Sequence, residues 1–145
     1  MVWKNLNRNW GNEHDIPILC KGDIVAARQL GRKISKEIGF GTVDQARITT
    51  AISELARNIF LYAGRGEICI EKVSESGKQG MIIVAKDKGP GIVDIRKVMQ
   101  DGYTTSGGLG AGLPGVKRLM DSFDIESSIE GDSKGTVITT TKWVR

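Results

Sequence analysis

Glu54 and Asn58 stand four residues apart in a stretch of helical periodicity. At this spacing two side chains project from the same helix face, one turn apart. A carboxylate placed there can accept or orient the proton of a hydroxyl group. An amide oxygen can complete the shell of Mg²⁺, which prefers hard oxygen ligands and often shares them with phosphates. Taken alone, however, the pair is more typical of an exposed polar helix face.

Asp87 follows a strand-like run and opens the sequence Asp-Lys-Gly-Pro-Gly-Ile. A carboxylate only accepts hydrogen bonds, so it can pair with the exocyclic amine of adenine but not with the oxygen of guanine at the same place. Gly89 and Gly91 would let the backbone approach a flat ring without a side-chain clash. An ordinary turn with a capping aspartate explains the same residues equally well.

A glycine-rich stretch, Gly107 to Gly112, leads into a predicted helix, and Gly108, Gly110 and Gly112 alternate within it. The amide groups at a helix N-terminus lack partners and attract anions, so this arrangement favours contact with phosphate over a flexible surface loop. Residues 110–115 also fit the dinucleotide fingerprint GxGxxG. That fingerprint requires a strand directly before it, whereas the preceding residues are polar and glycine-rich, which argues against a Rossmann fold.

Other residues that commonly perform chemistry give weaker signals. His14 is the only histidine, and no catalytic triad can be assembled around it. Cys20 and Cys69 each lie in an apolar stretch without metal-ligand spacing, so we expect two reduced thiols in the core.

The composition is that of an ordinary globular domain. The chain has 145 residues, of which 39% are hydrophobic and 26% charged, and its formal net charge is +4. No block of like charge points to nucleic acid, and no apolar run approaches the length of a membrane helix. We therefore expect a cytoplasmic protein with neither nucleic acid nor membrane as a partner.

The periodicity predicts the elements that must position these residues. Helices are expected over 23–38 and 42–62, with shorter helices over 93–100 and 113–121. Asp23 should cap the first of them, and a capping box of Thr42 and Gln45 should open the second. The buried stripe of the second helix should include Tyr62. Strands are expected over 16–20, 67–73, 81–86, 123–129 and 136–143.

Hairpins separated by helices predict an α/β (α+β) two-layer sandwich, with a mixed, mostly antiparallel sheet and helices on one face. Residues 1–15 read as a loosely ordered N-terminal extension, and residues 16–145 as a single domain.

The order of the motifs is more specific than any one of them. The chain resembles the superfamily of Hsp90, DNA gyrase B, MutL and the histidine kinases in the order of four motifs. These are ExxxN on a helix, DxGxG after a strand, GxGxG leading into a helix, and Gly135-Thr136 opening the last strand. The resemblance implies the Bergerat ATP-binding fold. It also implies that Thr136 supports the adenine-binding aspartate.

Residues 23–58 and 101–121 narrow the resemblance to the RsbT-like switch serine/threonine kinases of the bacterial stressosome. Such kinases use ATP and Mg²⁺ to phosphorylate STAS-domain scaffold proteins and, once released, activate a metal-dependent serine phosphatase. The resemblance implies Glu54 as the catalytic base, Asn58 as the metal ligand and Asp87 as the adenine ligand. It places Gly89 and Gly91 in the adenine pocket, and Gly108, Gly110 and Gly112 at the phosphates.

Two other readings stay open from the sequence. One is an anti-sigma-factor kinase of the same fold, which binds and blocks a sigma factor. The other is a docking module that holds ATP without transferring phosphate, in which Glu54 would be structural.

Overall fold

A computed structural model of the chain describes residues 14–100 and 112–145. Its helices are α1 (Gly22–Ile38), α2 (Thr42–Asn58), the π-helical turn η2 (Ile59–Ala63), α3 (Ile95–Val98) and α4 (Gly112–Leu119). Its strands are β1 (Asp15–Ile18), β2 (Gly66–Glu75), β3 (Lys78–Asp87), β4 (Ser122–Ser128) and β5 (Gly135–Trp143). Every predicted helix and strand is therefore present, with ends that differ by a few residues. Among the described residues, no helix is both long and apolar enough to cross a membrane.

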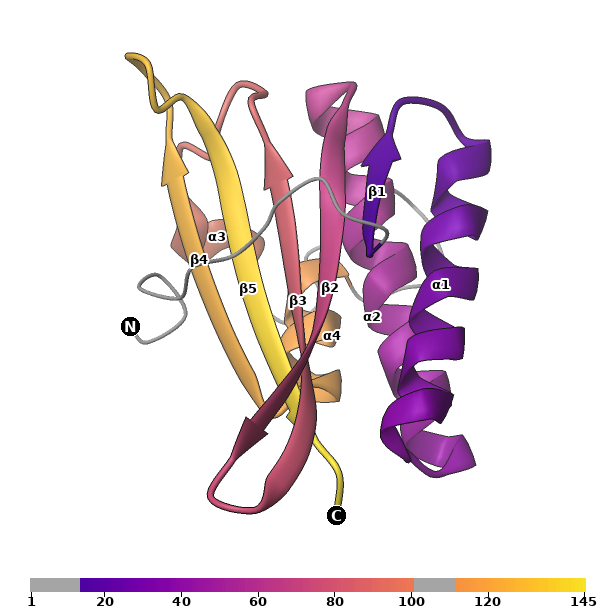
Figure 1. Cartoon of the computed structure of the whole chain (residues 1–145). Coiled ribbons are helices and arrows are strands. Elements are labelled where there is room, and N and C mark those ends of the chain that lie inside the picture. The colour runs from indigo at the N-terminus through magenta and orange to yellow at the C-terminus, as the bar shows by residue number, and fades with distance from the viewer. Residues whose placement is uncertain (1–13, 101–111) are drawn as a thin grey trace.

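The five strands form one sheet in the order β1-β2-β3-β5-β4 (Figure 1). Every pairing between the described strands is antiparallel, so the mixed sheet expected from the sequence is in fact uniform. The β2–β3 hairpin is longer than predicted because its turn is only two residues, Ser76 and Gly77, both with positive φ. Positive φ at both positions gives the turn the twist that two flanking strands require.

The helices lie together on one face of the sheet, as Figure 1 shows. The apolar core between the two layers is built from both, with Ile34 of α1, Ile52 of α2 and Val116 of α4 packed over Ile70 and Ile83 of the sheet. The predicted two-layer sandwich is confirmed. The first strand begins at Asp15, one residue before the predicted start, and residues 1–13 lie outside the described part of the chain.

Both predicted helix caps are wrong. The Asp23 carboxylate accepts from the backbone N–H groups of Leu19 and Cys20, so it fixes the loop before α1 rather than capping the helix. Helix α2 starts after Gly41 without a side-chain cap, because the Gln45 side chain donates to the carbonyl of Phe40 instead of closing a capping box.

Two predicted core positions lie at the surface. Tyr62 is 43% exposed, because the π-helical turn after Asn58 rotates it away from the stripe that an uninterrupted α-helix would give. Cys20 is exposed because β1 ends at Ile18 and leaves it in the loop before α1, whereas Cys69 is buried as expected.

Candidate functional site

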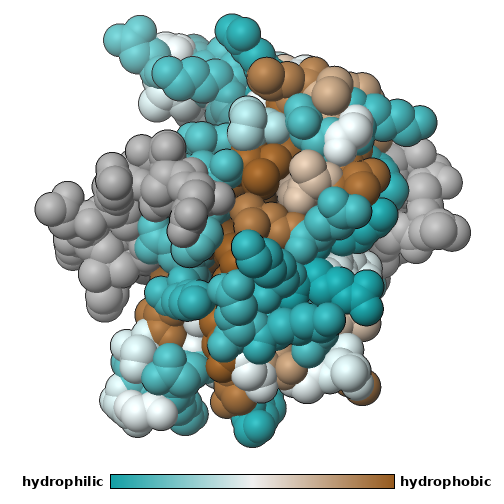
Figure 2. Space-filling model, turned by 45° about the vertical axis from the view of Figure 1, so that its right-hand side comes forward, coloured by the Kyte–Doolittle hydropathy of each residue, from teal (hydrophilic) through white to brown (hydrophobic). Residues whose placement is uncertain are grey.

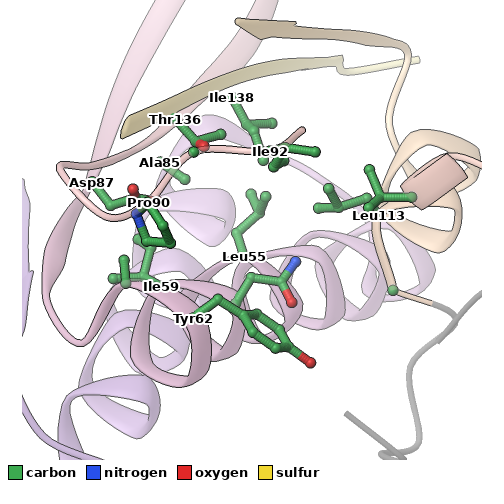
Figure 3. A pocket seen from close by; sticks show the side chains of 15 residues that line it. Leu55, Ile59, Tyr62, Ala85, Asp87, Pro90, Ile92, Leu113, Thr136 and Ile138 are labelled. Atoms are coloured by element: carbon green, nitrogen blue, oxygen red, sulfur yellow. The ribbon is translucent and has the colours of Figure 1, made fainter. Parts of the chain in front are cut away.

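A cavity of about 380 Å³ lies between the end of α2 and the end of the sheet at which β3 finishes and β5 begins (Figure 3). Its size falls in the usual range for small-molecule sites. Most of the lining is apolar, and it comes from α2 and η2, from β3 and β5, from the loop after β3, and from α3 and α4: Leu55, Asn58, Ile59, Tyr62, Ala63, Ala85, Asp87, Pro90, Gly91, Ile92, Val98, Gly112, Leu113, Thr136 and Ile138.

Among the described residues that line the cavity, Asp87 is the only acidic one. Its carboxylate accepts from the backbone N–H of Gly89 at 2.9 Å and from the backbone N–H of Thr136, its register partner on β5. Burial raises the pKa of this carboxyl, and the two backbone donors offset the rise only in part. The group is therefore held firmly in an apolar recess, with acceptor capacity left for a further donor.

Ser127 of β4 organises the wall behind Asp87, and sequence reasoning missed it. Its hydroxyl accepts from the backbone N–H of Ile92 at 2.8 Å and lies 3.0 Å from the carbonyl oxygen of Gly135 and 2.8 Å from the Thr136 hydroxyl. Since its single proton goes to Gly135, the Thr136 hydroxyl must donate to Ser127. One serine thus ties the loop after β3 to the start of β5.

The two glycines after Asp87 are required for different reasons. Gly89 packs against Ala63 of η2, where an added Cβ would lie 2.6 Å from that residue's Cβ. Gly91 has φ +78, and an added Cβ would collide with the carbonyl oxygen of Ser128. The structure therefore brings Gly91 into the cavity wall, whereas Gly89 serves the packing behind it.

The predicted pair on α2 is split by the geometry. Asn58 lines the cavity. Glu54 lies one turn earlier, is only 5% exposed, and is not part of the lining. Its carboxylate pairs at 2.9 Å with the guanidinium of Arg57, which sequence reasoning did not single out although the i,i+3 spacing would have suggested the contact.

The glycine-rich stretch is only partly described. Gly112 lines the cavity and begins α4, while Gly108 and Gly110 lie outside the described residues. The start of α4 and Asp87 therefore lie on opposite sides of the same cavity, as the positions of Leu113 and Asp87 in Figure 3 show.

These features together suit a purine nucleotide. The apolar walls from Leu55, Ile59 and Ile138 fit a flat ring, and the Asp87 carboxylate can accept from an exocyclic amine. Asn58 also lines the cavity, and its amide oxygen is a hard ligand that would suit a Mg²⁺ ion taking its other ligands from phosphate and water.

Residues 43–144 match the family described as "Histidine kinase-, DNA gyrase B-, and HSP90-like ATPase". The chain is 67% identical over 130 residues to the serine/threonine-protein kinase RsbT of Bacillus subtilis. The matched region covers 90% of this chain and 96% of that protein. It is 34% identical over 104 residues to an anti-sigma F factor of Thermoanaerobacter, covering 68% of this chain and 70% of the relative.

The fold has a counterpart among solved structures. A mycobacterial sensor histidine kinase, MprB, superimposes with a TM-score of 0.53 over 90% of this chain and 97% of that chain. The identity is 14%, so this likeness concerns the fold alone.

Proposed function

Because the chain belongs to the RsbT serine/threonine-protein kinases within the histidine kinase-, DNA gyrase B- and HSP90-like ATPases, we propose that it transfers the γ-phosphoryl group of ATP to serine or threonine of a partner protein. The observation that supports it most directly is the Asp87 carboxylate, which accepts from two backbone N–H groups inside a cavity that Asn58 and Gly112 also line.

The cavity selects adenine through Asp87. Two backbone N–H groups and the wall organised by Ser127 hold the carboxylate in place before any ligand arrives. The 6-amino group of adenine donates to it, whereas guanine would present an oxygen to an anion. Recognition of ATP over GTP then follows from one side chain in a fixed position.

Phosphoryl transfer depends on positioning and charge neutralisation more than on covalent help. The backbone N–H groups at the start of α4, Gly112 included, would hold the nucleotide phosphates. Gly108 and Gly110, which the family resemblance also assigns to the phosphates, lie outside the described residues. Asn58 would hold Mg²⁺, which would neutralise charge on the phosphates.

Glu54 orients the acceptor hydroxyl and takes its proton. Its pairing with Arg57 keeps the carboxylate in one orientation in the nucleotide-free protein. Because Arg57 is about one third exposed and Glu54 nearly buried, an incoming substrate can displace or share the guanidinium and so reach the carboxylate.

The proposed substrate is a protein, and the resemblance to switch kinases supports STAS-domain scaffold proteins of the stressosome as that partner. A metal-dependent serine phosphatase is the second partner, activated after release. Surface character supports contact with other proteins: the face turned to the viewer in Figure 2 has apolar side chains gathered through its middle and bordered by hydrophilic ones.

The test compares Glu54→Gln with the parent chain, with Glu130→Gln on the exposed β4–β5 turn as the matched control. Radiolabelled ATP, Mg²⁺ and STAS-domain substrates are supplied at equal concentrations. Loss of a general base lowers transfer by about 10²- to 10⁴-fold, while ATP affinity stays within threefold of the parent value. Equal labelling by Glu54→Gln would disprove the base assignment. ATP binding without transfer by the parent would identify a docking module.

The similarity to anti-sigma F factors favours one further candidate, a kinase that also sequesters a sigma factor. The two functions differ in what the chain retains on a column in the presence of ATP and Mg²⁺. Retention of purified STAS-domain proteins, with acid-stable phosphate on them, supports the switch-kinase function. Retention of a purified sigma factor instead supports the alternative.

A further inference from the structure

Glu54 stands at the boundary of the cavity wall that α2 provides. Leu55, the next residue, points into the cavity, as Figure 3 shows. With about 3.6 residues per helical turn, Asn58 lies about 40° to one side of Glu54 around the helix and Arg57 about 60° to the other. Asn58 lines the cavity, whereas Arg57 does not. The Glu54 side chain can therefore turn toward the cavity or away from it, and its partner decides which.

Arg57 is that partner in the structure. Its guanidinium Nη1 donates to Glu54 Oε1 at 2.9 Å, and Glu54 is not among the described residues that line the cavity. The side chain of Arg57 is 33% exposed, against 7% for that of Glu54. The guanidinium is thus the member of the pair that a second protein can reach.

A carboxylate held in this way affects what ATP can react with. The proposed function needs Glu54 to take a proton from serine or threonine, but the same group could take one from water. In that side reaction the water oxygen bonds to the γ-phosphorus, and the bond from the γ-phosphorus to the β,γ-bridging oxygen breaks with its electron pair going to ADP. The proton of the water goes to Glu54, and ATP is lost without a phosphorylated partner.

Water and an acceptor protein differ in how they compete for Arg57. A guanidinium presents several N–H donors in a fixed fork, which carboxylate and carbonyl groups of a docked protein can satisfy from fixed positions. A water molecule has neither a charge nor a fixed position, so it is a poor replacement for Glu54 as the partner of the guanidinium.

We propose that Arg57 is a positioning residue, which holds Glu54 out of the cavity until a docked acceptor protein draws the guanidinium away and lets Glu54 turn in. The ion pair is then an off-state that suppresses hydrolysis of ATP by water. This role of Arg57 rests on the proposed function, in which Glu54 is the base.

A second ion pair on the same helix provides the matched control. Arg47 pairs with Asp44 at 2.9 Å and at the same i,i+3 spacing, but Arg47 is 51% exposed and neither residue lines the cavity. The test variants are Arg57→Met, which removes the cation, and Arg57→Lys, which keeps it. Arg47→Met is the control.

Release of inorganic phosphate from ATP and Mg²⁺, with no partner present, is the first measurement. We expect Arg57→Met to raise the kcat of hydrolysis at least fivefold with the KM for ATP within twofold of the parent value. Arg57→Lys and Arg47→Met should both stay within twofold of the parent. Adding Glu54→Gln to Arg57→Met should abolish the increase, because the released base is then gone.

Urea unfolding of the nucleotide-free chain tests the ion pair independently of activity. Arg57→Met should lower the urea midpoint, since it leaves the nearly buried Glu54 carboxylate without a cation. Adding Glu54→Gln should restore part of that loss, because the two residues are coupled. Arg47→Met should shift the midpoint less, because its pair is more exposed.

The two possible failures are distinguishable. If the parent chain transfers no phosphate to STAS-domain proteins, the proposed function fails and the role of Arg57 fails with it. If the parent transfers phosphate normally but Arg57→Met hydrolyses ATP at the parent rate, the role of Arg57 alone is overturned. A urea midpoint of Arg57→Met equal to that of the parent would also overturn it, because the ion pair would then not form in solution.

Discussion

Asp87→Asn should weaken ATP binding strongly while leaving the fold intact. The parent carboxylate has two acceptor oxygens, which serve the backbone N–H groups of Gly89 and Thr136 and leave lone pairs for the adenine amine. Asparagine has one acceptor oxygen and two amide hydrogens. If the oxygen stays with Gly89, a donor faces the adenine amine, which is itself a donor.

The magnitude follows from the loss of one hydrogen bond to a charged group, about 1.5–3 kcal/mol. This corresponds to about a 13- to 160-fold increase in the Kd for ATP. Stability should change little or rise slightly, since burial raises the pKa of Asp87 and thus disfavours its ionised form in the folded protein. Function and stability therefore make opposite demands at this residue.

Isothermal titration calorimetry with a non-hydrolysable ATP analogue gives the affinity, and thermal unfolding of the nucleotide-free protein gives the stability. Asp132→Asn, on the exposed turn between β4 and β5, is the matched control. The reasoning is refuted if Asp87→Asn binds the analogue within threefold of the parent. It is also refuted if the parent binds GTP as tightly as ATP.

Three further predictions concern the same framework. ATP affinity should fall with decreasing pH as the Asp87 carboxyl is protonated, and because its pKa is raised, titration calorimetry should detect the fall at a higher pH than an ordinary aspartate would give. Gly91→Ala should lower the free energy of unfolding by more than the roughly 1–2 kcal/mol that left-handed backbone costs a residue with a Cβ. Gly131→Ala should show that strain alone, because nothing lies within 4 Å of its added Cβ. The difference between the two variants in urea unfolding therefore measures the collision of the Gly91 Cβ with Ser128. Lys142→Met should lower the free energy of unfolding in urea by roughly 3 kcal/mol. The buried ammonium of Lys142 donates to the Leu119 carbonyl at 2.7 Å and lies near two carboxylates. Lys117→Met, at an exposed position, should change that free energy by almost nothing.

Local pattern was enough to predict most of the fold. The helical spacing of Ile48, Ile52 and Leu55 and the alternating strands directly encode the two layers. The Asp87 loop could also be predicted as a site, because a carboxylate followed by two glycines after a strand places an acceptor beside permissive backbone.

Contacts between distant residues could not be predicted in the same way. Ser127 lies 35 residues from Ile92 in sequence, and only the β4–β5 register brings it to the wall behind Asp87. Tyr62 became exposed through a π-helical turn that periodicity does not reveal, and the cap residues found other partners in the loops. The roles of Glu54, Asn58 and the glycines of the phosphate loop stay predictions.

Phosphoryl transfer from ATP to a hydroxyl group of a partner can be distinguished from other outcomes by the chemistry of the labelled product. The full-length chain is incubated with γ-labelled ATP, Mg²⁺ and purified STAS-domain proteins, and the products are treated with acid and mapped. We expect acid-stable phosphate on serine or threonine of the partner, and much less of it with Asp87→Asn. Acid-labile phosphate, or ATP binding with no labelled partner, would contradict this expectation.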